Sequence, residues 1–282
     1  MIDPLKNWQQ WGFANKPICE KKFSEGENHH SWLIFADQQH WVIKHFEHSF
    51  DIATNNQQAA ADLGIAPQIR YADDPELLMQ FIANKDPARH HDHLHDIAKS
   101  LCKLHQAPLD IRCIDKPHTS INIANSFDIF AFAEHYLTDD NELDQQWHKT
   151  LSPALEHFLL DQTPHCFCHN DLVLENIMIA DDSVYFIDWE YGAINNPWFD
   201  LAAIILYAGL DESQSKEFLT AYKPAFSKLV LENIFVSSQI SLLWLDLLWH
   251  SARDRNYRQS HSARYQQLVK LSRQFGLNLS GS

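Results

Sequence analysis

Residues 169–190 constrain the fold of this chain more than any other stretch of its sequence. A polar segment, residues 169–176, is followed by the apolar run 177–179 and by two aspartates, and residues 184–187 then have the composition of a β-strand. Two short apolar runs around a polar turn predict a hairpin. The second strand ends at Asp188, so the hairpin would return Asp188 to the loop formed by the polar segment.

The polar residues of this loop and hairpin form a set that suits phosphoryl transfer. The reaction needs a carboxylate that orients and deprotonates the attacking hydroxyl, and oxygen ligands that hold Mg²⁺ against the ATP phosphates. Asp171 suits the first role, and Asn176 and Asp188 suit the second. Any one of these residues could instead be an ordinary turn or cap former, a common place for Asp and Asn. Their combination favours the catalytic interpretation.

The sequence resembles the aminoglycoside phosphotransferase and choline kinase superfamily, which carries an H-x-D-x-x-x-x-N loop followed by an I-D-[WF]-E motif. Residues 169–176 and 187–190 match the two parts. The resemblance implies the roles given above, with Asp171 as the catalytic base and His169 as a brace of the loop. It also implies a bilobal protein-kinase-like fold of the α+β class, with a small N-lobe of antiparallel sheet plus one helix and a larger, mainly helical C-lobe.

Further matches lie downstream of the motif. Asn196-Pro197 and then Asp200-Leu201-Ala202 follow it, and together with residues 187–191 they look most like bacterial choline kinases and thiamine kinases. The resemblance implies that Asp200 is a structural anchor for the catalytic loop.

The first part of the chain has the order of elements expected for such an N-lobe, which we place at residues 1–82. Residues 83–282 would form the C-lobe, with the catalytic loop, the metal site and the acceptor-binding helices. Strands are predicted over residues 17–23, 31–36, 40–46, 68–71 and 77–82, with a helix over 51–63. Further helices are predicted over residues 94–104, 201–210, 213–222, 229–255 and 263–275.

Several N-lobe residues are candidates for binding ATP. Lys44 ends the run Trp41-Val42-Ile43-Lys44 on the third strand, where kinases place an ammonium against the α- and β-phosphates. The alternative is a lysine on an edge strand that faces solvent. The turn with Gly26 and Asn28 could fold over the phosphates, and Gln80 and Ile82 lead into an expected hinge whose backbone would bind adenine.

The helix after the third strand departs from the superfamily pattern. A glutamate of this helix normally pairs with the strand lysine, but residues 51–58 contain none. Asn55, Asn56 or Gln57 could orient Lys44 through a neutral hydrogen bond, or Asp51 could reach it. The sequence leaves these alternatives open.

Aromatic residues are the best indication of the acceptor, because aromatic faces and a carboxylate hold a quaternary ammonium or thiazolium cation well. Glu190 and Asp246 are the candidate carboxylates. For any single tryptophan, packing in the core is the favoured interpretation, because aromatic side chains are common there. The candidate aromatic residues are Trp189, Tyr191, Trp198, Trp244, Trp249 and Tyr257.

Together these features predict an ATP- and Mg²⁺-dependent kinase that phosphorylates the hydroxyl of a small cationic alcohol, choline or ethanolamine. Thiamine and then an aminoglycoside are the alternative acceptors. The missing helix glutamate and the Gly-poor nucleotide loop leave a further alternative of another class, a catalytically inactive kinase-like protein that binds nucleotide.

Composition excludes other classes of protein. The net charge of -15 argues against a nucleic-acid surface, which needs clustered Lys and Arg. No run approaches the ~18 consecutive apolar residues of a membrane span, and the first residues lack the pattern of a secretion signal. A cytoplasmic location is therefore expected, while the oligomeric state is left open.

Cysteines and histidines offer two tempting metal patterns. The chain has 5 cysteines, an odd number without the spacing of a disulfide scaffold, so reduced thiols are expected. Cys166 and Cys168 would point to the same face of a strand, but no second cysteine pair accompanies them. His91 and His95 are four residues apart on a predicted helix, for which a solvated surface is the simpler interpretation.

Overall fold

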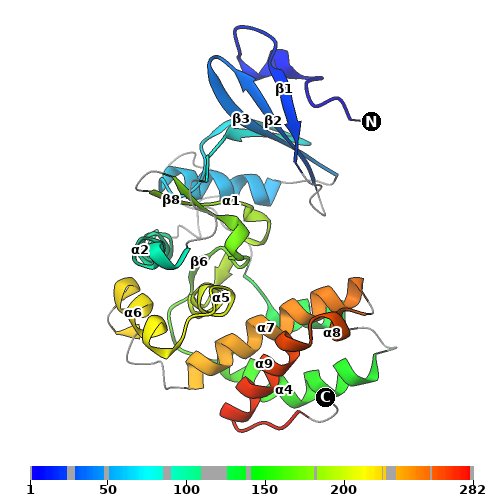
Figure 1. The fold of residues 1–282 in the computed structure, drawn as a ribbon, viewed down its shortest axis with the longest axis vertical. Coiled ribbons are helices and arrows are strands. Elements are labelled where there is room, and N and C mark those ends of the chain that lie inside the picture. Colours follow the sequence, from blue (N-terminus) through cyan, green and yellow to red (C-terminus); the bar gives the residue numbers. More distant parts are fainter. Residues whose placement is uncertain are drawn as a thin grey trace. The chain divides into compact units, whose positions relative to one another are not determined.

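The computed structural model describes residues 2–23, 29–47, 51–84, 90–108, 126–137, 141–180, 183–223, 225–226, 233–254 and 256–279 (Figure 1). By compactness the chain divides into two units, each formed from two segments. The first unit comprises Met1–Ala124 and Asp171–Ala193, and the second comprises Asn125–Asn170 and Ile194–Ser282. The lobe boundary expected between residues 82 and 83 stays a prediction.

The first unit contains a five-stranded antiparallel sheet with the order β1-β2-β3-β5-β4 (blue to cyan in Figure 1). Its five strands and its helix lie close to the predicted ranges, so the sequence pattern was sufficient here. The elements are β1 (Ile18–Lys22), β2 (His29–Ala36), β3 (Gln39–Phe46), α1 (Asp51–Asp62), β4 (Ile69–Asp73) and β5 (Glu76–Gln80).

One face of this sheet carries an apolar cluster and the other carries Lys44. The cluster joins residues of β2, β3 and β5 to aromatic side chains near the 3₁₀ turn η1 (Trp8–Trp11). Ile43 belongs to the cluster, and successive strand residues face opposite sides, so Lys44 lies on the opposite face. Since β3 lies between β2 and β5, the interpretation of Lys44 as an edge-strand residue is excluded.

The rest of the first unit carries the loop and hairpin predicted from the sequence. The 3₁₀ turn η3 (Leu174–Asn176) leads into β7 (Ile177–Ala180), which pairs antiparallel with β8 (Ser183–Phe186). The turn η4 (Trp189–Tyr191) follows directly after Asp188. The hairpin prediction is thus confirmed.

Upstream, η2 (His90–His93) precedes the amphipathic α2 (Leu94–His105), whose apolar stripe is buried. His91 and His95 are both exposed, as expected for a solvated face. The clusters of His, Cys, Asp and Glu close enough to share a metal ion, among the residues described, include neither histidine.

The second unit is mainly helical. Helix α7 is its centre, because it packs against α3, α4, α5 and α9, and twelve of its residues are buried. Figure 1 shows α9 and α4 running alongside it. The helices are α3 (Ile129–Tyr136), α4 (Glu142–Leu159), α5 (Trp198–Tyr207), α6 (Glu212–Tyr222), α7 (Asn233–Arg253), α8 (Tyr257–Ser260) and α9 (Ser262–Gln274).

The predictions for this unit were incomplete. The sequence pattern located α5, α6, α7 and α9 to within a few residues. Helices α3 and α4 are not among the predicted elements. The short strand β6 (Cys166–Cys168) pairs with β9 (Ala193–Asn195). In the parts of the chain with described structure, every helix is too short or too polar to span a bilayer.

Candidate active site

The loop that follows β6 places Asp171 and Asn176 against each other. The Asn176 side-chain amide donates to the backbone oxygen of Asp171 at 2.9 Å and to its carboxylate Oδ2 at 3.0 Å. The backbone N–H of Ile187 donates to the Asn176 carbonyl at 3.0 Å, which connects the loop to the end of β8. The chain therefore brings the predicted base and one predicted metal ligand into contact, next to the strand that leads to Asp188.

Asp188 pairs with Lys44. The Lys44 ammonium lies 3.1 Å from Asp188 Oδ1, and the lysine side chain is only 9% exposed. Asp188 has a φ of 69°, a left-handed conformation that is uncommon for residues other than glycine. Such backbone strain is found where a functional side chain must point in one direction. Here it directs the carboxylate toward the lysine of β3.

Helix α1 contacts the turn after Asp188 through a neutral side chain. The Asn56 amide donates to the backbone oxygens of Trp189 at 3.2 Å and Gly192 at 2.7 Å. Gln57 donates to the Pro67 carbonyl at 2.7 Å, and Asn55 is exposed. Helix α1, in which the superfamily pattern predicts a lysine-binding glutamate, therefore holds the η4 turn through Asn56.

Gly192 is required by this contact. A Cβ atom at Gly192 would lie 2.8 Å from Asn56 Nδ2, closer than real Cβ atoms approach, and 3.0 Å from its Cγ, which is also tight. The absence of a side chain at this position lets Asn56 reach the turn.

A further pair was not predicted from the sequence. His29 Nδ1 lies 3.0 Å from Glu190 Oε1, although the two residues are 161 positions apart. His29, Asp188 and Glu190 each offer one ligand atom, and these atoms lie within 4.8 Å of one another. The only sequence signal was that His29 ends the proposed nucleotide turn and is followed by a second histidine.

The second unit holds the start of the catalytic loop. Both oxygens of the Asp200 carboxylate accept backbone N–H groups, from His169 and from Asn170, at 2.8 Å each. His169 and Asp200 are fully buried. Asn170 has a φ of 64°, and its side-chain oxygen accepts a hydrogen bond from Asn195 at 2.8 Å. This network holds the backbone of residues 169 and 170, which directly precede Asp171 in the sequence.

Two of the predicted acceptor tryptophans are core residues. Trp198 has no exposed surface and packs on Phe226 and Phe235. Trp244 is equally buried and stacks on His148, to which its indole N–H donates at 3.1 Å. For both rings the core-packing alternative describes the observed environment.

Asp246 already has a cationic partner. The Arg264 guanidinium donates to Asp246 Oδ2 at 2.5 Å and to the Tyr257 hydroxyl at 3.2 Å. The neighbouring Trp249 ring is covered by the Arg253 guanidinium at 3.9 Å from its centroid, and Tyr257 stacks between two histidine rings. These aromatic and cationic side chains stack on one another, and the Asp246 carboxylate is neutralised by Arg264.

The other predicted residues occupy varied positions. Trp189 is buried and its indole N–H donates to the Phe186 carbonyl at 3.0 Å, whereas Tyr191 is partly exposed. Gln80 is exposed at the end of β5, and Ile82 just beyond it is buried. Gly26 and Asn28 lie outside the described residues.

The thiols of Cys166 and Cys168 lie on one face of β6, 3.7 Å apart, as the alternation predicted. Burial raises the pKa of the Cys168 thiol well above its ordinary value. Both thiols are buried, as expected for small apolar residues.

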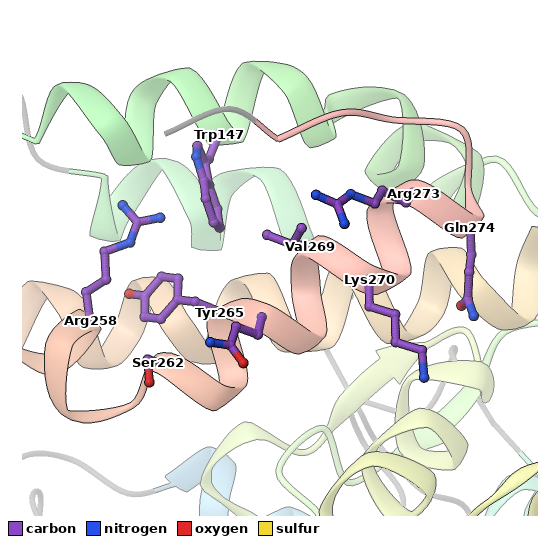
Figure 2. Close-up of a pocket in the computed structure, with 9 residues that line it drawn as sticks. Trp147, Arg258, Ser262, Tyr265, Val269, Lys270, Arg273 and Gln274 are labelled. Carbon is purple, nitrogen blue, oxygen red and sulfur yellow. The ribbon is translucent and has the colours of Figure 1, made fainter. Parts of the chain in front are cut away.

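A cavity of about 740 Å³ lies along α9 and contains none of the predicted site residues. Figure 2 shows the Trp147 and Tyr265 rings beside the Arg258 guanidinium, with Arg273 and Lys270 farther along the helix. Arg258 stacks over both rings, at 4.2 Å and 4.5 Å from their centroids, and burial raises the pKa of Tyr265 to about 12. The ionised groups that line this cavity are cations, so it does not suit a cationic acceptor.

Known proteins share this sequence pattern. A model described as the phosphotransferase enzyme family matches residues 21–230. A LicA homolog from Metamycoplasma hominis is 29% identical over 256 residues, which cover 87% of this chain and 89% of that protein. A probable ethanolamine kinase from Arabidopsis thaliana is 28% identical over 174 residues, covering 54% of this chain and 46% of that protein.

The fold is shared as well. The crystal structure of the choline kinase LicA from Streptococcus pneumoniae matches with a TM-score of 0.70 at 19% identity, covering 90% of this chain and 94% of that one. The expected protein-kinase-like α+β fold and the resemblance to the superfamily are thus confirmed. Since the family model spans well over half of the chain, the protein belongs to the phosphotransferase enzyme family and is a small-molecule phosphotransferase.

Proposed function

We propose that this enzyme transfers the γ-phosphate of ATP, with Mg²⁺, to the hydroxyl of choline. The observation that carries the proposal is the pairing of Lys44 with Asp188 at 3.1 Å, on the unit in which Asn176 contacts Asp171. A base, an amide, a carboxylate and an ammonium are the groups that phosphoryl transfer uses. In this proposal residues 1–82 form the N-lobe and residues 83–282 form the C-lobe.

The residues fit the metal ion. Asn176 and Asp188 offer amide and carboxylate oxygens, the ligand type that Mg²⁺ prefers, and the strained backbone of Asp188 holds its carboxylate in one direction. When bound, Mg²⁺ would neutralise charge on the phosphate oxygens. In the proposed reaction Lys44 binds the phosphates, and an Asp171 carboxylate oxygen orients the acceptor hydroxyl and accepts its proton.

The choice of choline is supported by the relatives and by the state of Asp246. The LicA from Streptococcus pneumoniae is a choline kinase. A trimethylammonium group donates no N–H hydrogen bonds and binds well to aromatic faces, whereas the ammonium of ethanolamine needs acceptors for its hydrogens. Because Asp246 is engaged by Arg264, it is less able to accept from ethanolamine. Tyr191 and Trp249 stay as proposed acceptor contacts, while the Glu190 carboxylate is paired with His29.

The test is ADP release by the purified enzyme in the presence of Mg-ATP and choline, ethanolamine, thiamine or an aminoglycoside. Choline should give the highest kcat/KM. Asp171→Ala should lower kcat by about 10²–10⁴-fold, the usual contribution of a general base, and leave Mg-ATP binding largely intact. If ethanolamine gave a higher kcat/KM than choline, ethanolamine would replace choline as the proposed acceptor. Loss of nucleotide binding in a folded Asp171→Ala protein would contradict the assignment of the base.

A further inference from the structure

The cluster of His29, Asp188 and Glu190 has a donor set that differs from an ordinary magnesium site. Two of its members are carboxylates and the third is an imidazole nitrogen. The three residues come from the start of β2 and from the segment after β8, and all belong to the first unit. An imidazole nitrogen is a ligand that first-row transition-metal ions accept, whereas Mg²⁺ prefers oxygen.

The spacing of the ligand atoms agrees with one shared ion. Ligands about 2.1 Å from an octahedral ion lie about 3 Å apart when adjacent and about 4.2 Å apart when opposite. His29 Nδ1 and Glu190 Oε1 are 3.0 Å apart, and every pair in the cluster lies within 4.8 Å. Small side-chain adjustments are therefore enough to bring all three atoms to one ion.

The imidazole is held in position by the sheet. His29 lies opposite Phe46 in the β2-β3 register, and the two rings are in contact with centroids 5.4 Å apart. The His29 side chain is only 10% exposed and that of Glu190 only 20%. A buried ring with a defined orientation loses little conformational freedom when it binds a metal ion.

The neighbouring His30 provides an internal comparison. Successive strand residues point to opposite faces, so His30 is directed away from the cluster. Its Nε2 lies 3.7 Å from Glu47, a residue outside the cluster. The two adjacent histidines thus lie on the same strand, but only His29 faces Asp188.

We propose that His29 is a nitrogen ligand of the divalent ion at Asp188 and Glu190, so that the site binds Mn²⁺ or Co²⁺ more tightly than Mg²⁺. The inference rests on the proposed function only in that this ion is the one that accompanies the nucleotide. Asp188 and Glu190 each offer one carboxylate oxygen to the cluster, and His29 offers one ring nitrogen. The alternative is a hydrogen bond between His29 and Glu190 that stabilises the fold without binding metal.

The experiment measures Mn²⁺ binding to the full chain by electron paramagnetic resonance, without nucleotide, so that protein groups and water are the ligands of the ion. Histidine is labelled with ¹⁵N, and pulsed measurements detect its coupling to the bound ion. The variants are His29→Ala and His29→Gln, with His30→Ala as the matched control. Unfolding curves recorded in parallel show whether each variant is folded.

We expect ¹⁵N coupling in the wild type and in His30→Ala, and its loss in both His29 variants. Mn²⁺ affinity should fall by at least about tenfold in the His29 variants, with a smaller change for Mg²⁺. Bound Mn²⁺ without ¹⁵N coupling, an unchanged ratio of Mn²⁺ to Mg²⁺ affinity, or no Mn²⁺ binding at all would overturn the proposal. Since no turnover is measured, failure of the acceptor assay would leave this result intact. Likewise, absence of a His29–metal coupling would not affect the outcome of the acceptor assay.

Discussion

The residues proposed for nucleotide and metal binding are polar and already in contact, whereas those proposed for acceptor binding are mostly buried or paired. Lys44 lies against Asp188, and Asn176 lies against Asp171. In contrast, Trp198 and Trp244 are core residues, and Asp246 is neutralised by Arg264. Selectivity for the acceptor is therefore expected to depend on the few partly exposed groups among the proposed contacts, Tyr191 and Trp249.

Removal of the Asp188 carboxylate, which pairs with Lys44, should have the largest effect on nucleotide binding. Asp188→Ala should lower metal-dependent nucleotide binding by at least about 10–100-fold, because a ligand of the ion and the partner of the lysine are lost together. Calorimetric titration with Mg-ADP measures this effect. Asp246→Ala serves as the control from the proposed acceptor region and should bind Mg-ADP as the wild type does. Unchanged Mg-ADP affinity in Asp188→Ala would exclude its metal role.

The next largest effect concerns the buried anchor of the catalytic loop. Asp200→Ala leaves the N–H groups of His169 and Asn170 without their acceptors. Each unsatisfied buried donor costs about 1–3 kcal/mol, so the free energy of unfolding should fall by about 2–6 kcal/mol. Asp200→Asn keeps one acceptor oxygen and should lose less. Equal stability of the two variants in urea unfolding would show that these hydrogen bonds are not the source of the effect.

A smaller effect tests the contact between α1 and the η4 turn. Gly192→Ala places a Cβ against Asn56, and overpacking of this kind typically costs about 1–3 kcal/mol. Asn56→Ala removes the clash, so the two substitutions together should cost less than the sum of their separate effects. Thermal unfolding of the four proteins measures this coupling, with the exposed Asn55→Ala as a control. Strict additivity would mean that Asn56 does not hold the turn.

The smallest effect concerns the aromatic core of the second unit. Burial lowers the pKa of His148 below its ordinary 6.5, and Trp244 donates to its Nδ1. The unfolded chain therefore binds a proton at a pH where the folded chain does not, so stability is lost as pH falls below about 6.5. The unfolding free energy of the wild type should thus decline between pH 7 and 5.5 more than that of His148→Gln. If the unfolding free energies of the wild type and of His148→Gln fall with pH in parallel, then His148 is not the source of the acid sensitivity.

Sequence patterns were sufficient where local alternation or a short motif determines the structure. The strands around Lys44 and the hairpin before Asp188 follow from alternation and turn residues close together in the chain. The contact of His29 with Glu190 joins residues 161 positions apart, so no local pattern could reveal it. The burial of Trp244 was equally hidden, because a helix that is covered on several sides gives the same apolar signal whether its aromatic residues bind a ligand or fill the core.

The amide of Asn56 has a consequence for regulation. Protein kinases switch activity by moving a helix whose glutamate makes or breaks an ion pair with the strand lysine. Here α1 is joined to the η4 turn by an uncharged side chain that accepts no proton in the physiological range, and salt does not screen such a contact as it screens exposed charges. The contact between α1 and the η4 turn should therefore depend little on ionic strength and on cellular pH. A helix held in this way differs from one held by an ion pair, whose strength changes with both.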